Sequence, residues 1–275
     1  MIGPMFSLNG ELRPVAEATV PLDDVAFAYG FGVYETLKVR HGVVYFADLH
    51  EERLWESART IDLEHPFKPG DFRRFVDELT AANGLGDANL KALLVGGAKA
   101  SDARLSILAL NPLFPDRKDY KQGATAISWS GERVFPRAKT LNMLVSYLAF
   151  REAQNLGAYD ALLVNRRGEV TEGTRTNLFV TDGTGLATAP AGQVLAGVTQ
   201  LTVRQVVRDL GISLEERPLP LSEVGTWQGA FLTSTSTKIM PLRRIDATAL
   251  PLSPLVDKLR LAYDGWLDAY GRRRS

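Results

Sequence analysis

Two β-hairpin signals near the start of the chain constrain its fold more than any other feature. The apolar segment 6–12 is interrupted by an Asn-Gly dipeptide at 9–10, the pair that most strongly favours a two-residue turn between antiparallel strands. A second apolar, β-branched segment, 34–46, turns at the sequence RHG, 40–42. The N-terminal part of the chain is therefore predicted to contain an antiparallel sheet.

Helical patterns are mixed with further strands in the same part of the chain. Asp48 is positioned to cap a helix that runs to about Thr60, and residues 72–83 form a second amphipathic pattern. Two more apolar strands are expected at 90–95 and 104–109. This part of the chain is thus predicted to be a small α/β domain.

A linker pattern separates this part from the rest of the chain. Residues 111–123, NPLFPDRKDYKQG, carry two prolines, clustered charges and a terminal glycine. We predict one domain over residues 1–115, a linker over 116–122 and a second domain over 123–275. The second domain is expected to contain, in order, strand 124–129, helix 141–155, strands 160–164 and 169–180, helix 198–210, strand 229–234 and helix 255–270.

The composition excludes several classes of partner. The 275 residues include 32 Lys+Arg and 32 Asp+Glu, and this balance does not indicate a protein that binds nucleic acid or an anionic membrane. No apolar run reaches the roughly 18 residues of a membrane span, and the N-terminal segment lacks a signal-peptide pattern. The chain has no cysteine, and its histidines His41, His50 and His65 are not spaced as metal ligands. We therefore expect a cytoplasmic protein without a metal.

An acidic and a basic residue lie three positions apart in the segment VTEGTRTN, 170–177. Glu172 stands near the end of a predicted strand, where a carboxylate must find a partner. That partner is either a structural cation, the ordinary case for such a residue, or a basic nitrogen of a bound ligand. The sequence around Glu172 and Arg175 leaves both alternatives open.

Lys139 precedes a largely apolar segment, 141–148. A lysine at the edge of such a segment can be partly desolvated, which lowers the pKa of its amine and makes the amine nucleophilic, as Schiff-base chemistry requires. A solvated surface charge is the ordinary alternative for a single lysine.

Three further features could each bind an anion. Gly197 allows close approach of the backbone, and the amides of Val198 and Thr199 would open a helix there. The hydroxyl groups of TSTST, 233–237, and the guanidinium of Arg53 could add hydrogen bonds. Each feature also fits an ordinary helix start, turn or surface arginine.

Six segments, in their order along the chain, resemble the class IV pyridoxal-phosphate-dependent aminotransferases (fold type IV). They are FAYGFGVYETLKV, HEERLWESA, AKTLN, VTEGTRTNLFV, VLAGVTQ and LTSTSTKIMP. The family includes D-amino-acid aminotransferases, branched-chain aminotransferases, amine transaminases and aminodeoxychorismate lyase. The resemblance implies pyridoxal 5′-phosphate as cofactor. It also implies an α+β fold, with a small N-terminal α/β domain and a larger C-terminal domain that has a β-barrel-like core.

The resemblance also assigns roles to individual residues. Lys139 would be the Schiff-base lysine and would move a proton between the substrate Cα and C4′ of the cofactor, and Glu172 would keep the pyridine nitrogen protonated. Tyr34 would lie near the cofactor or the substrate carboxylate. The phosphate would be held by Arg53, the amides of Val198 and Thr199, and Thr235, and Leu195 would pack against the ring. The family is usually homodimeric, with a neighbouring subunit completing the active site.

Several positions bear on the branch of the family. Branched-chain enzymes carry a tyrosine five residues after the lysine, where this chain has Leu144, and lyases tend to carry threonine where this chain has Glu35. The D-amino-acid branch usually has an arginine and a histidine after the strand 90–95, and this chain has neither. Another cation must then bind the substrate carboxylate. Arg175 is the first candidate, Lys238 the second and Lys99 a weaker third, and a surface role is the ordinary case for both lysines.

We therefore predict a D-amino-acid transaminase with a non-standard carboxylate trap, which uses an amino-acid donor and a 2-oxo-acid acceptor in a ping-pong reaction. A branched-chain L-amino-acid aminotransferase is the alternative, ahead of aminodeoxychorismate lyase and amine transaminase. A cofactor-binding relative without turnover is a further alternative. The presence of Lys139, Glu172 and Arg53 argues against it.

Overall fold

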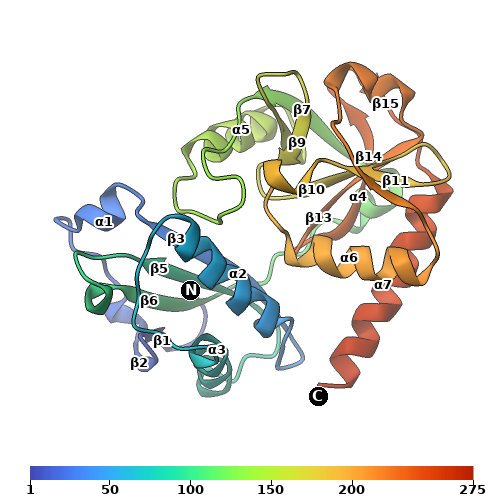
Figure 1. The fold of residues 1–275 in the computed structure, drawn as a ribbon. Coiled ribbons are helices and arrows are strands. Elements are labelled where there is room, and N and C mark those ends of the chain that lie inside the picture. Colours follow the sequence, from blue (N-terminus) through green and yellow to red (C-terminus); the bar gives the residue numbers. More distant parts are fainter. Residues whose placement is uncertain (275) are drawn as a thin grey trace. The chain divides into compact units, whose positions relative to one another are not determined.

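The computed structural model describes residues 1–274 and divides into two compact units (Figure 1). The first unit comprises residues 1–113, 138–142 and the described residues from 271 onward. The second unit comprises residues 114–137 and 143–270. A division at one linker does not describe this arrangement, because the segment 138–142 returns to the first unit.

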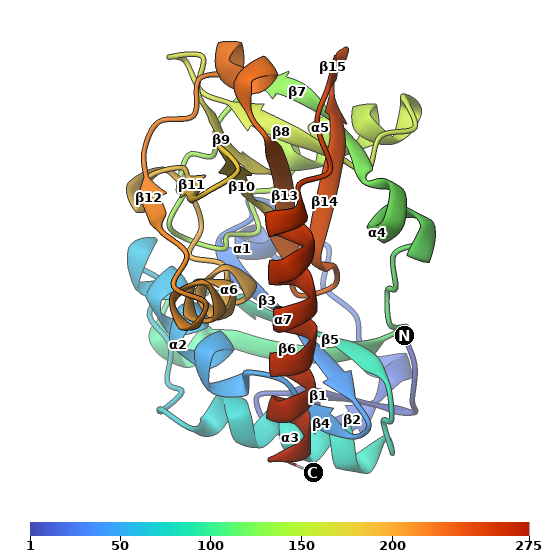
Figure 2. The same cartoon turned by 90° about the vertical axis from the view of Figure 1, so that its right-hand side faces the viewer.

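The first unit is built on a six-stranded sheet with the strand order β2-β1-β6-β5-β3-β4 (Figure 2). Neighbouring strands are antiparallel, and they are β1 (Met5–Leu8), β2 (Glu11–Pro14), β3 (Gly32–Arg40), β4 (Val43–Val44), β5 (Ala88–Val95) and β6 (Arg104–Leu110). Both predicted hairpins are confirmed. Asn9 and His41 take positive φ angles of 55° and 50°, and each is followed by a glycine with positive φ, as a tight turn between twisted strands requires.

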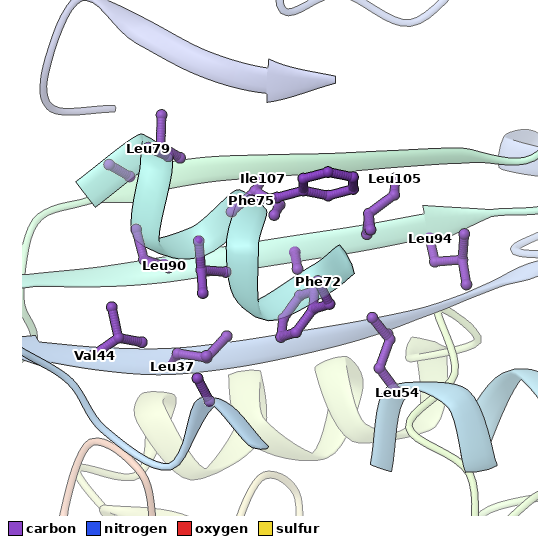
Figure 3. Packing of buried hydrophobic residues seen from close by; sticks show 14 of the residues in the cluster. Leu37, Val44, Leu54, Phe72, Phe75, Leu79, Leu90, Leu94, Leu105 and Ile107 are labelled. Atoms are coloured by element: carbon purple, nitrogen blue, oxygen red, sulfur yellow. The ribbon is translucent and has the colours of Figure 1, made fainter. Parts of the chain in front are cut away.

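Helices close the core of the first unit against this sheet. Figure 3 shows Phe72 of α3 (Asp71–Ala82) beside apolar side chains of the strands, which include Leu37 and Leu90. All three side chains are fully buried, and burial of such a side chain stabilises the fold by about 2 kcal/mol. The remaining helical elements of this unit are α1 (Val25–Ala28), α2 (Ala47–Thr60) and two short 3-10 helices, Val15–Glu17 and Ala100–Asp102.

The start of α2 differs from the prediction. Its N-cap is Phe46, in the left-handed region with φ 56°, and no side chain caps the helix. The side chain of Phe46 is buried, which brings the chain into the helix two residues earlier than expected. The prediction that Asp48 caps this helix is therefore wrong. Asp48 lies in the first turn, where its charge still interacts favourably with the helix dipole.

The segment 138–142 lies along β3. The backbone N–H of Tyr34 donates to the carbonyl of Lys139 over 2.9 Å, and the N–H of Leu141 donates to the carbonyl of Gly32 over 2.8 Å. These two bonds hold the segment 138–142 alongside β3 within the first unit.

The second unit contains a closed ring of six strands (Figures 1 and 2). The ring order is β10-β13-β14-β7-β8-β9, and the pairing of β9 with β10 closes it. Its strands are β7 (Ala124–Ser130), β8 (Asp160–Val164), β9 (Val170–Gly173), β10 (Asn177–Thr181), β13 (Gly229–Ser234) and β14 (Lys238–Ile245). Outside the ring lie β11 (Leu186–Thr188), β12 (Leu214–Glu216) and β15 (Thr248–Ala249). The predicted β-barrel-like core is confirmed.

The second unit contains the helices α4 (Arg117–Gln122), α5 (Leu144–Asn155) and α6 (Val198–Asp209), and the 3-10 helices Ala191–Gln193 and Leu221–Thr226. It also contains α7 (Pro254–Arg272) as far as Tyr270. None of the helices in residues 1–274 combines the length and the apolar character that crossing a membrane requires.

The predicted linker over 116–122 contains a helix. The side chain of Asp116 accepts a hydrogen bond from Lys118 N over 2.9 Å and so caps α4. The clustered charges that suggested a linker lie on this short, largely exposed helix.

Two other element boundaries also need correction. The helix expected over 141–155 begins only at Leu144, because the residues before it pair with β3. The strand expected over 169–180 is two strands, β9 and β10, with a turn at 174–176 between them.

Candidate active site

Lys139 is held in place by its backbone. Its N–H donates to Ser57 Oγ over 3.0 Å, and its carbonyl accepts from Tyr34 N. Its side chain is half-buried, and Nζ lies 4.4 Å from the centroid of the Tyr34 ring. Lys139 forms no ion pair with a carboxylate among residues 1–274. The first unit therefore contains an amine that is partly shielded from water and not paired with a carboxylate of the described residues.

Glu35, His50 and Arg53 form a buried polar cluster in the first unit. Glu35 lies on β3 and is fully buried. Its carboxylate accepts from Arg53 Nε and Nη2, each over 2.7 Å, and lies 2.7 Å from His50 Nδ1. The predicted phosphate ligand Arg53 is thus fixed by a bidentate ion pair, the geometry that orients a guanidinium most strongly.

The charges in this cluster follow from its burial. Burial alone would raise the pKa of Glu35, but the nearby charges of Arg53 and His50 hold it well below its ordinary value. Burial lowers the pKa of His50 despite its contact with Glu35. The cluster therefore contains an ionised carboxylate paired with an ionised guanidinium.

Glu172 lies on β9 and is buried. Its Oε1 accepts from Arg133 Nη1 over 3.0 Å, and its Oε2 accepts from Leu195 N over 3.1 Å. Both contacts favour the ionised carboxylate. The carbonyl of Leu195 accepts from Asn177 Nδ2 over 2.9 Å, so the same backbone segment that holds Glu172 is itself held by β10.

Arg175 lies in the turn between β9 and β10. The buried carboxylate of Asp160 anchors this turn by accepting from the hydroxyl groups of Thr174 and Thr176. Arg175 itself is exposed, and its guanidinium carbon lies 3.9 Å from the centroid of the Phe150 ring on α5. The second unit thus fixes the turn and stacks its arginine on a helix.

The N-terminus of α6 has the features of an anion site. No side chain caps the helix, and its first backbone hydrogen bond runs from Leu201 N to Gly197 O over 2.9 Å. The preceding amides of Val198 and Thr199 therefore have no partner within the helix. Asn177, whose side chain lies beside Gly197, pairs with Thr233 across β10 and β13. Oγ1 of Thr233 is buried and lacks a hydrogen-bond partner among residues 1–274. An anion bound at the N-terminus of α6 would accept hydrogen bonds from these amides.

Thr235 and Lys238 lie at the β13–β14 turn. Thr235 is half-buried. The ammonium group of Lys238 is 2.6 Å from Asp264 Oδ1 on α7, so the second predicted carboxylate-binding cation already has an acidic partner. No cluster of three or more side chains suited to a metal ion occurs among residues 1–274.

The structure also contains partners that sequence reasoning did not find. Arg133 contacts Glu172 across 39 positions of sequence, which no local pattern reveals. His50 contacts Glu35 across 15 positions. His50 did leave one signal, because it precedes Arg53 by three residues and so shares a face of α2 with it.

Comparison with known proteins bears on this arrangement of residues. The family described as amino-transferase class IV matches residues 32–245. The D-alanine aminotransferase of Bacillus licheniformis is 29% identical over 252 residues, which cover 88% of each chain. A putative branched-chain-amino-acid aminotransferase of Methanocaldococcus jannaschii is 30% identical over 257 residues, again 88% of each chain.

A solved structure shares the fold. The branched-chain aminotransferase from Thermoproteus uzoniensis, crystallised with norvaline, superimposes with a TM-score of 0.87 at 28% identity, over 95% of this chain and 94% of that chain. The predicted fold type IV architecture is confirmed. The resemblance seen in the six sequence segments is confirmed as well.

Proposed function

Because this chain belongs to the class IV aminotransferases, a family of pyridoxal-phosphate-dependent enzymes, we propose that it transfers the amino group of a D-amino acid to a 2-oxo acid. The observation that carries the proposal is the state of Lys139, which is half-buried, fixed at its backbone and without a carboxylate partner among residues 1–274. Such an amine is suited to react with an aldehyde.

Lys139 and Glu172 have the central roles in this proposal. When bound, pyridoxal phosphate supplies a ring that accepts the electron pair released from the substrate Cα–H bond. Nζ of Lys139 is proposed to anchor the cofactor and to take the proton from the substrate Cα. Glu172 is proposed to accept a hydrogen bond from the N–H of the ring. Its contacts with Arg133 and Leu195 N support this role because they favour the ionised carboxylate.

The phosphate is proposed to bind at the N-terminus of α6. The uncapped amides of Val198 and Thr199 support this assignment, since they offer two N–H donors and the positive end of the helix dipole. The hydroxyl of Thr235 and the guanidinium of Arg53 are proposed to add donors. The side chain of Leu195, which is half-buried, is proposed to pack against the ring.

Chemical trapping tests the central residue. Borohydride treatment of the protein loaded with pyridoxal phosphate should attach the cofactor irreversibly to the peptide that contains Lys139, as read by mass spectrometry. Lys139→Ala should lose this label and nearly all transamination. Lys68→Ala, an exposed lysine of the same unit, is the control and should keep both. A label on another lysine, or full activity in Lys139→Ala, would overturn the proposal.

The stereochemical part of the proposal has its own support. Leu144 replaces the tyrosine of the branched-chain pattern, and the Bacillus licheniformis D-alanine aminotransferase is similar to this chain. A branched-chain L-amino-acid aminotransferase is the second candidate, because the Methanocaldococcus jannaschii protein is similar to the same extent. Assays with D-alanine and L-leucine as donors separate the two. Exclusive use of L-leucine would reject the D-amino-acid assignment, and release of pyruvate from aminodeoxychorismate without an acceptor would indicate a lyase.

The quaternary structure and location are also part of the proposal. A homodimer is supported by the apolar side chains of Leu22, Val25 and Tyr29, which are more than half exposed and lie close together in sequence. Light scattering on the purified protein tests it, and a monomer would contradict it. A cytoplasmic location stays a prediction from composition.

A further inference from the structure

A second lysine lies on the same face of the first unit's sheet as Tyr34. In the pairing of β3 with β5, Tyr34 is opposite Leu93 and Thr36 is opposite Lys91. Residues directly opposite each other point to one face of a sheet, and so do residues two positions apart along a strand. Tyr34, Thr36, Lys91 and Leu93 therefore share a face.

Two ammonium groups lie around the ring of Tyr34. Nζ of Lys139 is 4.4 Å from the ring centroid and Nζ of Lys91 is 5.9 Å from it. Both lysines are half-buried, and neither forms an ion pair with a carboxylate in the part of the chain that the structure describes. All three residues belong to the first unit, so their relation does not depend on the second.

This grouping has an unbalanced charge. Contact between a cation and an aromatic ring is weak compared with a charge-assisted hydrogen bond. Two like charges that are partly shielded from water also raise the local positive potential. Lys91 and Lys139 therefore favour binding of an anion beside Tyr34.

We propose that Lys91 is the cation that binds a carboxylate of the amino-acid and 2-oxo-acid substrates, with Tyr34 beside it. The inference rests on the proposed function, in which Lys139 reacts with the cofactor. Once the amine of Lys139 is engaged in that way, Lys91 is the ammonium group that remains next to Tyr34. A carboxylate bound there lies close to the reacting amine, as the substrate of a transaminase requires.

Arg175 and Lys238, the first two candidates from the sequence, are less suited to bind the substrate carboxylate. Lys238 is neutralised by Asp264. Arg175 stacks on Phe150 in an exposed turn, where water screens its charge. Lys91 is only half exposed, and it has no acidic partner among the residues that the structure describes.

Kinetic measurements on Lys91 variants test the proposal. Lys91→Gln should lower kcat/KM for glutamate of the accepted handedness, which carries both kinds of carboxylate, about 10- to 100-fold, the loss expected for one charge-assisted hydrogen bond. The loss should lie mainly in KM, and Lys91→Arg should restore most of the affinity. Lys68→Gln removes the same charge from an exposed site of the same unit and should change nothing.

Two further comparisons show whether Lys91 binds the α-carboxylate or a side-chain carboxylate. An equal loss for alanine and glutamate indicates the α-carboxylate, and a loss confined to glutamate indicates a side-chain carboxylate. Either outcome supports the proposal. Propionate and succinate cannot react with the cofactor, so their dissociation constants, measured by tryptophan fluorescence, report the same site without turnover. In Lys91→Gln both constants should rise if Lys91 binds the α-carboxylate, and only that of succinate should rise if it binds a side-chain carboxylate.

The outcome that would overturn the inference is distinct from failure of the proposed function. If the wild-type protein binds pyridoxal phosphate and transaminates, but Lys91→Gln stays within twofold of wild type for all these substrates and inhibitors, Lys91 is not the carboxylate cation. A large loss of kcat/KM in Arg175→Gln alone would then indicate that Arg175 binds the substrate carboxylate. If the wild type does not bind the cofactor at Lys139, the proposed function itself fails.

Discussion

Arg53 donates hydrogen bonds to both carboxylate oxygens of Glu35, through Nε and Nη2, each over 2.7 Å. The pair is shielded from water, since the side chain of Glu35 is 0% exposed and that of Arg53 11% exposed. His50 contacts the same carboxylate from the preceding turn of α2. Glu35 therefore sets the orientation of the guanidinium that we propose as a phosphate ligand, although it touches no cofactor in that proposal.

Glu35→Gln should reduce the free energy of unfolding by about 3–5 kcal/mol, because it removes one member of a buried ion pair and leaves the charge of Arg53 uncompensated. Urea unfolding measures this change. Glu56→Gln is the matched control. Glu56 pairs with Arg59 at the surface of α2, the helix that carries Arg53, and loss of this pair should cost less than about 1 kcal/mol. Equal effects of the two substitutions would contradict the structural role of Glu35.

Short motifs name candidate residues for the site, but they do not name the residues that pair with them. Lys139, Glu172 and Arg53 could be named from motifs because each motif is a short continuous segment. Their partners could not, since the contacts of Glu35 with Arg53 and of Glu172 with Arg133 join different elements of the fold. Side-chain pairing of this kind is set by tertiary structure, which a local pattern does not contain.

A pH dependence of stability is expected from His65. Its ring packs against that of Trp55 at a centroid distance of 4.4 Å. Burial lowers its pKa below the ordinary 6.5, against a smaller opposing effect of a hydrogen bond with the backbone of Phe67. The unfolded chain therefore binds this proton more readily than the folded chain. The contribution to stability is present above about pH 6.5 and decreases as the pH falls through that value.

Urea unfolding between about pH 8 and pH 5 measures this dependence. His65→Gln should make the decrease toward low pH shallower, because the titrating ring is gone. His41→Gln serves as the control, since His41 lies in an exposed turn. An unchanged slope in His65→Gln would show that the decrease comes from other groups, such as the buried His50, whose pKa is also lowered by burial.

The fold shows where local patterns are sufficient. The turns at Asn9 and His41 were predictable because positive φ angles demand particular residues. The start of α2 was not, since Phe46, which is buried and left-handed, occupies the N-cap position that was expected for Asp48. The extended conformation of 139–141 was missed for a similar reason, because its backbone partners are on β3. Tertiary contacts thus accompany the two elements that local patterns did not predict.

Gly197→Ala should weaken binding of pyridoxal phosphate by more than about tenfold, because a rigid anion site at a helix N-terminus loses donors when its backbone shifts. A Cβ on residue 197 would lie only 2.1 Å from Asn177 Oδ1, so either the start of α6 or the side chain of Asn177, which holds the carbonyl of Leu195, must shift. Equilibrium dialysis of the cofactor measures the change. Gly192→Ala is the control in the same loop, since a Cβ there meets no atom within 4 Å, and it should bind the cofactor like wild type.

Glu172→Gln should leave the cofactor bound but reduce kcat by at least about 100-fold, because a neutral amide does not hold a proton on the ring nitrogen as a carboxylate does. The substitution also removes the carboxylate that pairs with Arg133 in the wild type, which adds to its effect. Cofactor stoichiometry and kcat are measured on the same preparation, so that loss of binding and loss of turnover are separated. Glu132→Gln, at an exposed position of the same unit, should keep the wild-type kcat. Wild-type turnover in Glu172→Gln would show that the reaction in this enzyme does not require an acid at the ring nitrogen.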